Sequence, residues 1–566
     1  METKEAIASE LSKLTKLKKE EILPLIEKPK YANLGDFAFP CFPLAKIQKK
    51  NPYDIAMELK EEIITPQGFE RVDALGGYLN FFLDKKILAV SVINKALKEK
   101  DKYGSSKKGK GKSIVIDYSS PNIAKPMTIG HLRSTIIGNS LYKTYSFLGY
   151  KCIGINFLGD YGTQFGKLIV AYRKWGIPAE LKADPIKALL KLYNKFHAEA
   201  EGNPQLDESA RQEFKKLESG DKENLAIWKN FRALSIAEFE KFYKTLGVKF
   251  DVDSGESFYR NDAPKIIDDL IKRKIAVESQ GALVIEMEKD MPPLLIRKSD
   301  GATMYSSRDL AAAIDRYKKY KFEKLLYVVA SEQNAYFKQL FKALELMNLK
   351  WAKNCHHVSF GMIYMPEGGK VSTRKGEIIF LEDVLEKIIE LSRHLIKENS
   401  KFSEKEKESI AKAVGISALI YSDLSNDRIK DVKFDWDKIL RLEGDSGPYL
   451  QYTYARAKSI LEKAGSSPKK ISSDSLGFEL ADEEKELITL VSEFPQIVES
   501  AAEHFSPNII ANYALKVSDT FNTFYEKCPV LKAEKEKAFR LALTPSVAQV
   551  LKNSMLLLGM IPLEHM

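Results

Sequence analysis

From Ser113 onward the chain alternates buried strands with amphipathic helices, and this alternation most restricts the possible folds. The segment SIVIDY (113–118) is typical of a strand, residues 131–149 of a helix, and KCIGINF (151–157) of a second strand. The alternation resumes later with a helix at 308–318, a strand at 325–330, a helix at 335–348 and a strand in HVSFGM (357–362). Such a pattern predicts a parallel, doubly wound sheet.

The rest of the chain predicts further domains. Charged helices and a short sheet interrupt the alternation at about 176–300, so we expect one nucleotide-binding fold over 113–376 that is split by an insertion. Residues 1–103 read as a small α/β module, and the Gly/Ser/Lys-rich residues 104–112 as a linker. Residues 377–566 read as helices throughout, which predicts a bundle. The expected fold class is therefore α/β and all-α multidomain.

Composition excludes some classes of protein. The chain has 566 residues, of which 44% are hydrophobic, and it lacks a run of eighteen apolar residues. We therefore expect a globular protein without a membrane span. The N-terminal segment lacks the apolar core of a secretory signal, which predicts a cytoplasmic location. The four cysteines form no CxxC pair, so we expect neither a disulfide framework nor a zinc site.

The formal net charge of +10 leaves two interpretations open. A basic protein attracts a polyanionic partner such as RNA at long range. A lysine-rich but ordinary surface would give the same total.

The segment SSPNIAKPMTIGHLRST (119–135) is the strongest functional signal, because it follows a strand and opens a helix. The free N–H groups and the dipole of a helix N-terminus favour phosphate, and Gly130 lets the backbone approach a ligand. His131 adds a donor and Lys125 a positive charge where a phosphoryl transition state would develop charge. The alternative is an ordinary strand-to-helix turn with a hydrogen-bonded histidine.

This segment resembles the first signature of class I aminoacyl-tRNA synthetases in its arginyl form. The resemblance implies that Gly130 and His131 bind ATP, and that His131, Lys125 and Thr128 share the catalysis. Thr128 stands where the usual signature has its first histidine.

The segment GGKVSTRKGEIIFLEDVL (368–385) resembles the second class I signature, a loop that grips the pyrophosphate end of ATP. Thr373 stands where the second lysine of that signature usually lies. The resemblance implies that Lys125 compensates, with Arg374 and Lys375 as further candidates. The ATP-binding residues that it implies are Lys370, Ser372, Thr373, Arg374 and Lys375. We expect Mg²⁺ to arrive with ATP, without a dedicated protein site.

Arginine recognition is the next implication. A guanidinium group is a flat array of donors that carboxylates bind well. FDVDSGESFY (250–259) and ATMYSSRDLAAAIDRY (302–317) resemble the strings in which the arginyl family keeps its pocket. The arginine-binding residues implied by resemblance are Glu256, Tyr305, Asp309, Asn122, Gln333, Asp117 and Ser119.

Three further segments resemble the same family. GINFLGDYGTQFG (154–166) matches a family string that is open to a purely structural interpretation, because glycines are common at strand-to-helix turns. GDSGPYLQYTYARAKSIL (444–461) resembles the start of the anticodon-binding bundle. YANLGDFAFPCFPLAKIQKKNP (31–52) resembles the appended domain that contacts the outer corner of tRNA. The candidate tRNA-binding residues are Tyr449, Tyr452 and Tyr454, which either stack on bases or pack in a core.

Taken together, the resemblance implies an arginyl-tRNA synthetase with a split Rossmann-type core, an inserted connective domain, an N-terminal α/β appendage and a C-terminal helical bundle. Its partners would be arginine, ATP and the arginine tRNA, and its first step would need bound tRNA. We expect a monomer. Two alternatives stay open: a class I synthetase for another amino acid, against which Glu256 and Asp309 argue, and a non-enzymatic RNA-binding relative, against which His131 and Lys125 argue.

Overall fold

The structure is a computed structural model that describes residues 2–288, 291–299, 301–364, 380–396, 402–465 and 470–566. Its contacts divide the chain into two compact units. The first contains Met1–Asp101, Ile460–Glu493 and Thr520–Gln549. The second contains Lys102–Ser459, Phe494–Asp519 and Val550–Met566.

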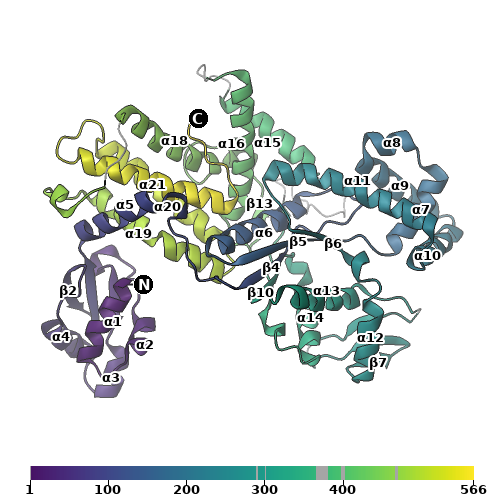
Figure 1. Cartoon of the computed structure of the whole chain (residues 1–566), viewed down its shortest axis with the longest axis horizontal. Helices are drawn as coiled ribbons and strands as arrows, with labels where there is room; N and C mark the ends of the chain where they lie inside the picture. The colour runs from purple at the N-terminus through teal and green to yellow at the C-terminus, as the bar shows by residue number, and fades with distance from the viewer. Residues whose placement is uncertain (1, 289–290, 300, 365–379, 397–401, 466–469) are drawn as a thin grey trace. The chain divides into compact units, whose positions relative to one another are not determined.

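The N-terminal part of the first unit is a three-stranded antiparallel sheet with helices packed against it (Figure 1). Apolar side chains such as Leu11, Phe39, Ile55 and Phe81 are buried together in its core. The sheet has the order β1-β3-β2, with β1 at Phe37–Pro40, β2 at Phe69–Leu75 and β3 at Tyr78–Leu83. The helices of this module are α1 (Glu2–Leu14), α2 (Lys19–Ile22), α3 (Phe42–Gln48) and α4 (Pro52–Glu62). Helix α5 (Lys85–Glu99) follows β3 and lies away from the sheet (Figure 1).

The second unit is built on a five-stranded sheet whose neighbours all pair in parallel. The order is β11-β10-β4-β5-β6, with β4 at Ser113–Asp117, β5 at Lys151–Leu158, β6 at Val252–Gly255, β10 at Lys324–Tyr327 and β11 at Cys355–His357. Helices α6 (Ile129–Phe147), α13 (Tyr305–Tyr320) and α14 (Asn334–Leu346) connect or flank these strands. Gly138 lets α6 pack closely, because a Cβ there would lie 2.3 Å from the Tyr118 side chain.

The insertion differs from the expected range 176–300. Strand β6 lies inside that range but pairs with β5 as an edge of the main sheet. It is only four residues long and carries two glycine or serine positions, so its sequence does not stand out as a buried strand. Strand β11 ends at His357, where the predicted strand HVSFGM begins, and beyond it this segment keeps an isolated parallel bridge between Ala330 and Phe360.

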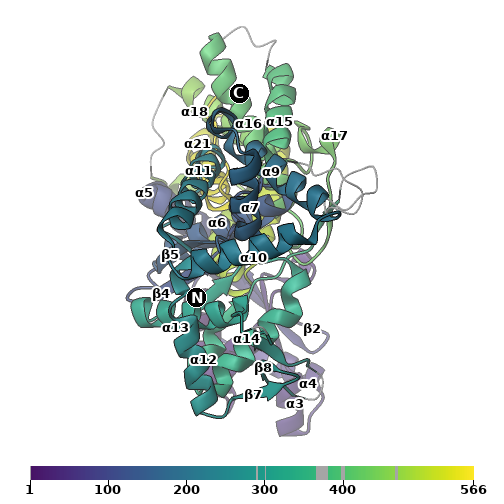
Figure 2. The same cartoon turned by 90° about the vertical axis from the view of Figure 1, so that its right-hand side faces the viewer.

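Two groups of elements flank β6 along the chain. Before it, helices gather beside the sheet on the side of β5 and β6 (Figure 1, Figure 2): α7 (Thr163–Trp175), α8 (Pro178–Ala183), α9 (Pro185–Ala200), α10 (Pro204–Glu218) and α11 (Lys222–Leu246). After it, α12 (Ala263–Lys272) and an antiparallel sheet share the core of β4 and α13, with strands β7 (Ala276–Ser279), β8 (Ala282–Ile285) and β9 (Leu294–Arg297).

The predicted linker 104–112 is not simply solvated. The N–H of Ser106 donates to the Phe147 carbonyl, and the N–H of Gly109 donates to the Leu148 carbonyl. Gly109 is buried, and a Cβ there would lie 2.3 Å from the Tyr150 ring. Gly109 therefore serves close packing in this segment, whereas Gly111 is exposed and has open space at its Cβ position.

The C-terminal part is helical, as the sequence predicts, but its helices are shared between the two units. Periodicity shows that a helix has an apolar face, not which partner covers it. The predicted domain limits 1–103 and 377–566 stay predictions. The helices are α15 (Leu381–Ile396), α16 (Glu404–Leu424), α17 (Trp436–Ile439), α18 (Gly447–Ala464), α19 (Asp482–Glu503), α20 (Asn508–Lys527) and α21 (Lys537–Leu558).

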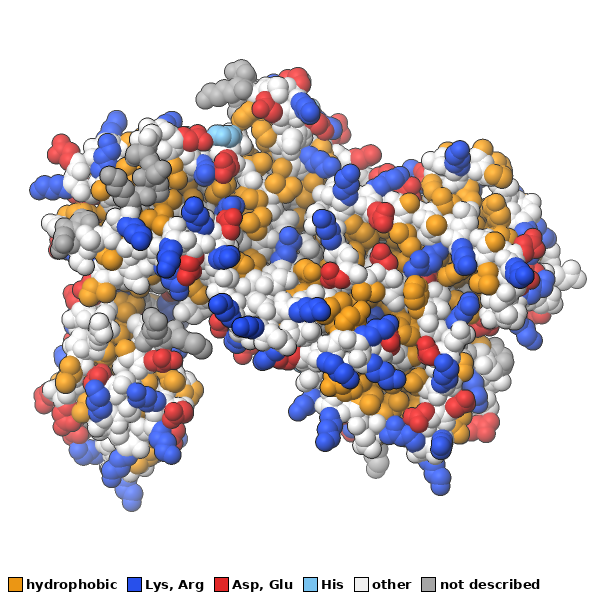
Figure 3. All heavy atoms as spheres, in the orientation of Figure 1, with side chains coloured by type: hydrophobic (Ala, Val, Ile, Leu, Met, Phe, Trp, Pro, Cys, Tyr) orange, Lys and Arg blue, Asp and Glu red, His pale blue; other side chains and the backbone are white. Residues whose placement is uncertain are grey.

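Surface and core composition give two further observations. Helix α21 is long and apolar enough to cross a membrane, but 72% of its most apolar window is buried inside the protein, as in a core helix. Basic side chains are spread over the visible face with acidic ones between them (Figure 3).

Candidate active site

The N-terminus of α6 presents His131 in a defined protonation state. The backbone N–H of Thr128 donates to Nδ1 of His131 over 3.0 Å, and the Thr128 hydroxyl lies 3.0 Å from the same nitrogen. A nitrogen that accepts from a backbone N–H carries no proton, so Nε2 holds the proton of the neutral ring. Burial, and then the charge of Lys125, lower the pKa of His131. His131 is therefore a neutral donor through Nε2.

Thr128 is the residue immediately before α6, and its backbone is extended. It pairs with Phe380 in an isolated antiparallel bridge, and the N–H of Leu381 donates to the Met127 carbonyl over 2.9 Å. The described end of the second-signature segment thus lies beside the first signature. The predicted ATP ligands Lys370, Ser372, Thr373, Arg374 and Lys375 lie outside the described residues.

Lys125 lies in the loop before α6, at a half-buried position. Its ammonium group is 5.5 Å from the centre of the Tyr193 ring on α9. A cation over an aromatic face is attracted by the ring quadrupole. The loop lysine thus lies between the N-terminus of α6 and helix α9.

Glu256 follows β6 and is held by an arginine of the chain itself. Arg308 donates from Nε over 2.9 Å, and its Nη2 lies 2.7 Å from the same Oε2 atom of Glu256. Burial raises the pKa of Glu256, and the charge of Arg308 opposes that shift. Only one of the two carboxylate oxygens takes part in these contacts.

Asp309 follows Arg308 on α13. Among the described residues, no arginine or lysine lies within ion-pair distance of its carboxylate. The Tyr336 hydroxyl donates a hydrogen bond to its Oδ2 atom. Burial, opposed by this hydrogen bond, raises the pKa of Asp309 to about 7. Tyr305, one turn earlier, is 44% exposed and packs edge-on against the Tyr336 ring.

Asp117 and Ser119 are engaged within the protein. Asp117 at the end of β4 is 2.7 Å from Nη2 of Arg316 through Oδ2, and its Oδ1 accepts from the Ser120 hydroxyl over 2.7 Å. The Ser119 hydroxyl lies 2.9 Å from that of Tyr243 and accepts from Thr135. Their predicted contacts with arginine stay predictions.

Asn122 and Gln333 are exposed at the loops after β4 and β10. Asn122 is bridged to Gly159, where a Cβ would lie 1.9 Å from the Asn122 Oδ1 atom. Gly159 therefore permits the close approach of the loops after β4 and β5. Because parallel strands end at the same edge of a sheet, both predicted ligands belong to the edge that also carries His131.

The three candidate tyrosines of α18 differ in exposure. Tyr454 is 3% exposed, which fits core packing. The Tyr449 hydroxyl donates to Asp519 over 2.9 Å. Tyr452 is 37% exposed and stacks with Arg456 at 4.8 Å, so it is the one most open to a base.

Two other residues of the α18 motif have structural roles. A Cβ on Gly447 would lie 2.6 Å from the Ser417 carbonyl oxygen, so glycine lets α18 approach α16. Buried Gln451 donates to the Ile561 carbonyl over 2.7 Å and to the Ser417 hydroxyl over 3.1 Å.

A split parallel sheet, a Gly-His turn opening its first helix and a helical C-terminal part together define a class I aminoacyl-tRNA synthetase. Three family models match the chain: "tRNA synthetases class I (R), catalytic domain" over residues 92–436, "DALR anticodon binding domain" over 450–566 and "Arginyl tRNA synthetase N terminal domain" over 1–83. The chain belongs to the arginyl-tRNA synthetase family, which confirms the predicted family and fold class.

Curated relatives agree over the full length. The chain is 47% identical to the arginine–tRNA ligase of Clostridium perfringens over 570 residues, covering 100% of both chains. It is 47% identical to that of Alkaliphilus metalliredigens over 549 residues, covering 96% of each.

Solved structures show the same fold. The arginyl-tRNA synthetase of Plasmodium falciparum matches with a TM-score of 0.83 and 26% identity, covering 100% of this chain and 98% of that one. That of Thermus thermophilus matches with a TM-score of 0.82 and 24% identity, covering 100% and 99%.

The raised pKa of Asp309 predicts pH-dependent arginine binding. A guanidinium group favours the ionised carboxylate, so binding below the pKa first requires loss of a proton. We expect the dissociation constant for arginine, measured by calorimetry, to rise about tenfold between pH 8 and pH 6.

Ionisation without ligand costs stability, so the Asp309 contribution to the free energy of unfolding decreases as pH rises from about 4 through about 7.

Tyr336→Phe provides the control for this prediction. It removes the hydroxyl that donates to Asp309, so the midpoint of the pH dependence should move to higher pH. A dissociation constant that is flat between pH 6 and pH 8 would contradict the role assigned to Asp309.

Proposed function

We propose that this chain carries out its family's reaction, the ATP-driven joining of arginine to tRNA, with the residues at the carboxyl edge of the β4–β6 sheet. Membership of the family makes the chain an arginine–tRNA ligase. The residue assignment rests mainly on Asp309, whose carboxylate has no cationic partner among the described residues. The other acid of the proposed site, Glu256, is already paired with Arg308.

In the first step, the arginine carboxylate attacks the α-phosphorus of ATP and pyrophosphate leaves. The protein's contribution is to position the reactants and stabilise charge. His131 donates from Nε2 to phosphate, assisted by the backbone at Gly130 and by Thr128. Lys125 supplies positive charge, and Mg²⁺ accompanies ATP.

Arginine binds with its guanidinium between the carboxylates of Glu256 and Asp309, with the Tyr305 ring beside them. Its α-groups contact Asn122 and Gln333, with Asp117 and Ser119 supporting this edge. Charge-assisted hydrogen bonds of this kind contribute about 1.5–3 kcal/mol each. In the second step, a ribose hydroxyl at the 3′ end of tRNA attacks the adenylate carbonyl, and AMP leaves.

Three further properties belong to this proposal. The tRNA contacts include the tyrosines of α18, chiefly Tyr452. The first step requires bound tRNA. The chain acts as a cytoplasmic monomer, without a membrane and without a protein-held metal.

Arginine-dependent exchange of labelled pyrophosphate into ATP tests the proposed reaction. We expect exchange with arginine and the arginine tRNA, and none when the tRNA is left out. Exchange without tRNA would keep the enzyme and reject the coupling. Absence of exchange under both conditions, in folded protein, would contradict the proposed function.

Lys125 is the residue that we expect to replace the missing lysine of the second signature. Lys125→Ala should lower kcat on the order of 10²-fold, because it removes a charge aimed at the transition state. Lys125→Arg should retain more activity, and Arg374→Ala should lose less than about tenfold. Near-normal activity of Lys125→Ala together with loss of activity in Arg374→Ala would reverse the assignment.

A further inference from the structure

The segment 154–166 resembles a family string, yet the reaction described above uses none of its side chains. Within it, Asp160 follows β5 and is completely buried. Its carboxylate accepts from the Ser257 N–H over 2.9 Å, from the Ser257 hydroxyl over 2.8 Å and from Nε of Arg232 over 2.9 Å. Its backbone carbonyl accepts from the indole N–H of Trp228 over 2.8 Å. This buried carboxylate therefore joins three separate parts of the chain.

The contacts of Asp160 lie on both sides of Glu256. Ser257 follows Glu256 and gives the Asp160 carboxylate two hydrogen bonds. Gly255 precedes Glu256, and a Cβ there would lie 2.5 Å from Oδ2 of Asp160. The backbone at 255–257 is thus fixed against Asp160, while the side chain of Glu256 is fixed separately by Arg308.

Arg232 makes this arrangement possible by compensating a buried charge. Burial raises the pKa of Asp160, and the hydrogen bonds from Ser257 and Arg232 oppose that shift. A carboxylate in this position without its cation would carry a large desolvation cost. Arg232 comes from α11 and also lies 5.4 Å from the centre of the Phe258 ring. Helix α11 is thereby tied to the residues around Glu256.

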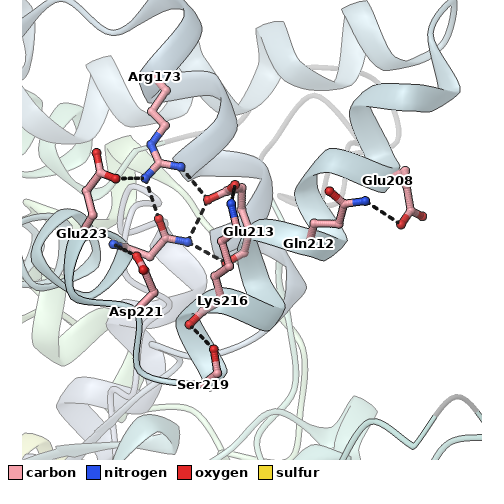
Figure 4. A network of polar contacts seen from close by, with 9 residues as sticks. Arg173, Glu208, Gln212, Glu213, Lys216, Ser219, Asp221 and Glu223 are labelled. Carbon is pink, nitrogen blue, oxygen red and sulfur yellow. Dashed lines mark hydrogen bonds and ion pairs between the residues drawn. The ribbon is translucent and has the colours of Figure 1, made fainter.

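A second arginine of the same helical insertion supplies a comparison. Arg173 on α7 contacts Glu213 over 2.5 Å, Asn224 over 2.8 Å and Glu223 over 3.0 Å (Figure 4). This network joins α7, α10 and α11 and includes no described contact with 255–257. It has the chemistry of the Asp160–Arg232 pair without its connection to the pocket.

We propose that Asp160 and Arg232 form a positioning pair that sets the orientation of Glu256 for binding the guanidinium group of arginine. Neither residue contacts the substrate; both act through the backbone at 255–257. The inference rests on the proposed role of Glu256. It also gives the segment 154–166 a part in specificity, beyond the turn that its glycines form.

The test compares Arg232→Met with Arg173→Met in the full-length chain. The readouts are the KM for arginine and the KM for ATP in pyrophosphate exchange with tRNA present, together with Tm. Arg232→Met should raise the KM for arginine at least tenfold and change the KM for ATP less than twofold. Arg173→Met should lower Tm to a similar extent and leave both KM values within twofold.

Two further variants keep the test decisive if Arg232→Met does not fold. Asp160→Asn keeps the shape of the side chain but removes its charge, and should also raise the KM for arginine selectively. Arg232→Lys keeps the positive charge and should restore most of the affinity.

The outcomes separate the inference from the proposed function. Wild-type protein that shows no arginine-dependent exchange would reject the proposed function itself. Wild-type exchange with an unchanged arginine KM in Asp160→Asn and Arg232→Met would overturn the positioning role. Equal changes in both KM values, matched by Arg173→Met, would do the same by showing a general loss of structure.

Discussion

The compensation of buried negative charge is the constraint on which this site depends. Carboxylates lie at or just after the ends of three neighbouring parallel strands, and a fourth lies in the first turns of α13. An ionised carboxylate taken out of water requires a partner, or it becomes protonated. Three of the four have arginine partners: Asp117 with Arg316, Asp160 with Arg232, and Glu256 with Arg308. The fourth, Asp309, has a tyrosine hydroxyl instead.

This difference separates the two acids of the proposed arginine site. Glu256 is already paired with Arg308 through one carboxylate oxygen, whereas Asp309 lacks a cationic partner among the described residues. Its pKa of about 7 means that the free protein holds it partly neutral at physiological pH. A guanidinium ligand supplies the positive charge that favours ionisation. In the proposed role of Asp309, recognition of arginine and compensation of a buried charge are the same interaction.

At His131, the determining interaction is a backbone hydrogen bond rather than the pairing of a buried acid. His131 is neutral because its Nδ1 atom accepts a backbone N–H and because burial lowers its pKa. In its proposed role, His131 therefore offers ATP a hydrogen-bond donor whose direction is already fixed. The replacement of the first signature histidine by Thr128 is compatible with this arrangement, because the backbone of residue 128 makes the bond.

Sequence patterns predicted the parallel sheet and most helices, because their periodicities are local. They missed β6 as a sheet strand, since four residues of mixed polarity carry no clear alternation. The arginine site was predicted from resemblance, as three acids together with Tyr305, Asn122, Gln333 and Ser119. The partners that determine how each acid behaves, Arg308, Arg316 and Tyr336, could not be identified, because the pairing of residues far apart in sequence depends on the fold. Asp160 illustrates this point, since its glycine-rich surroundings suggested only a turn.

The most direct test of the account is discrimination between arginine and citrulline in tRNA charging. Citrulline has nearly the same shape, but an uncharged urea group replaces the guanidinium. If Asp309 and Glu256 recognise the charge, kcat/KM for arginine should exceed that for citrulline by about 10⁴-fold or more, because a neutral group gives the buried Asp309 carboxylate no cationic partner. A ratio below about tenfold would contradict the account, because the pocket would then select shape alone.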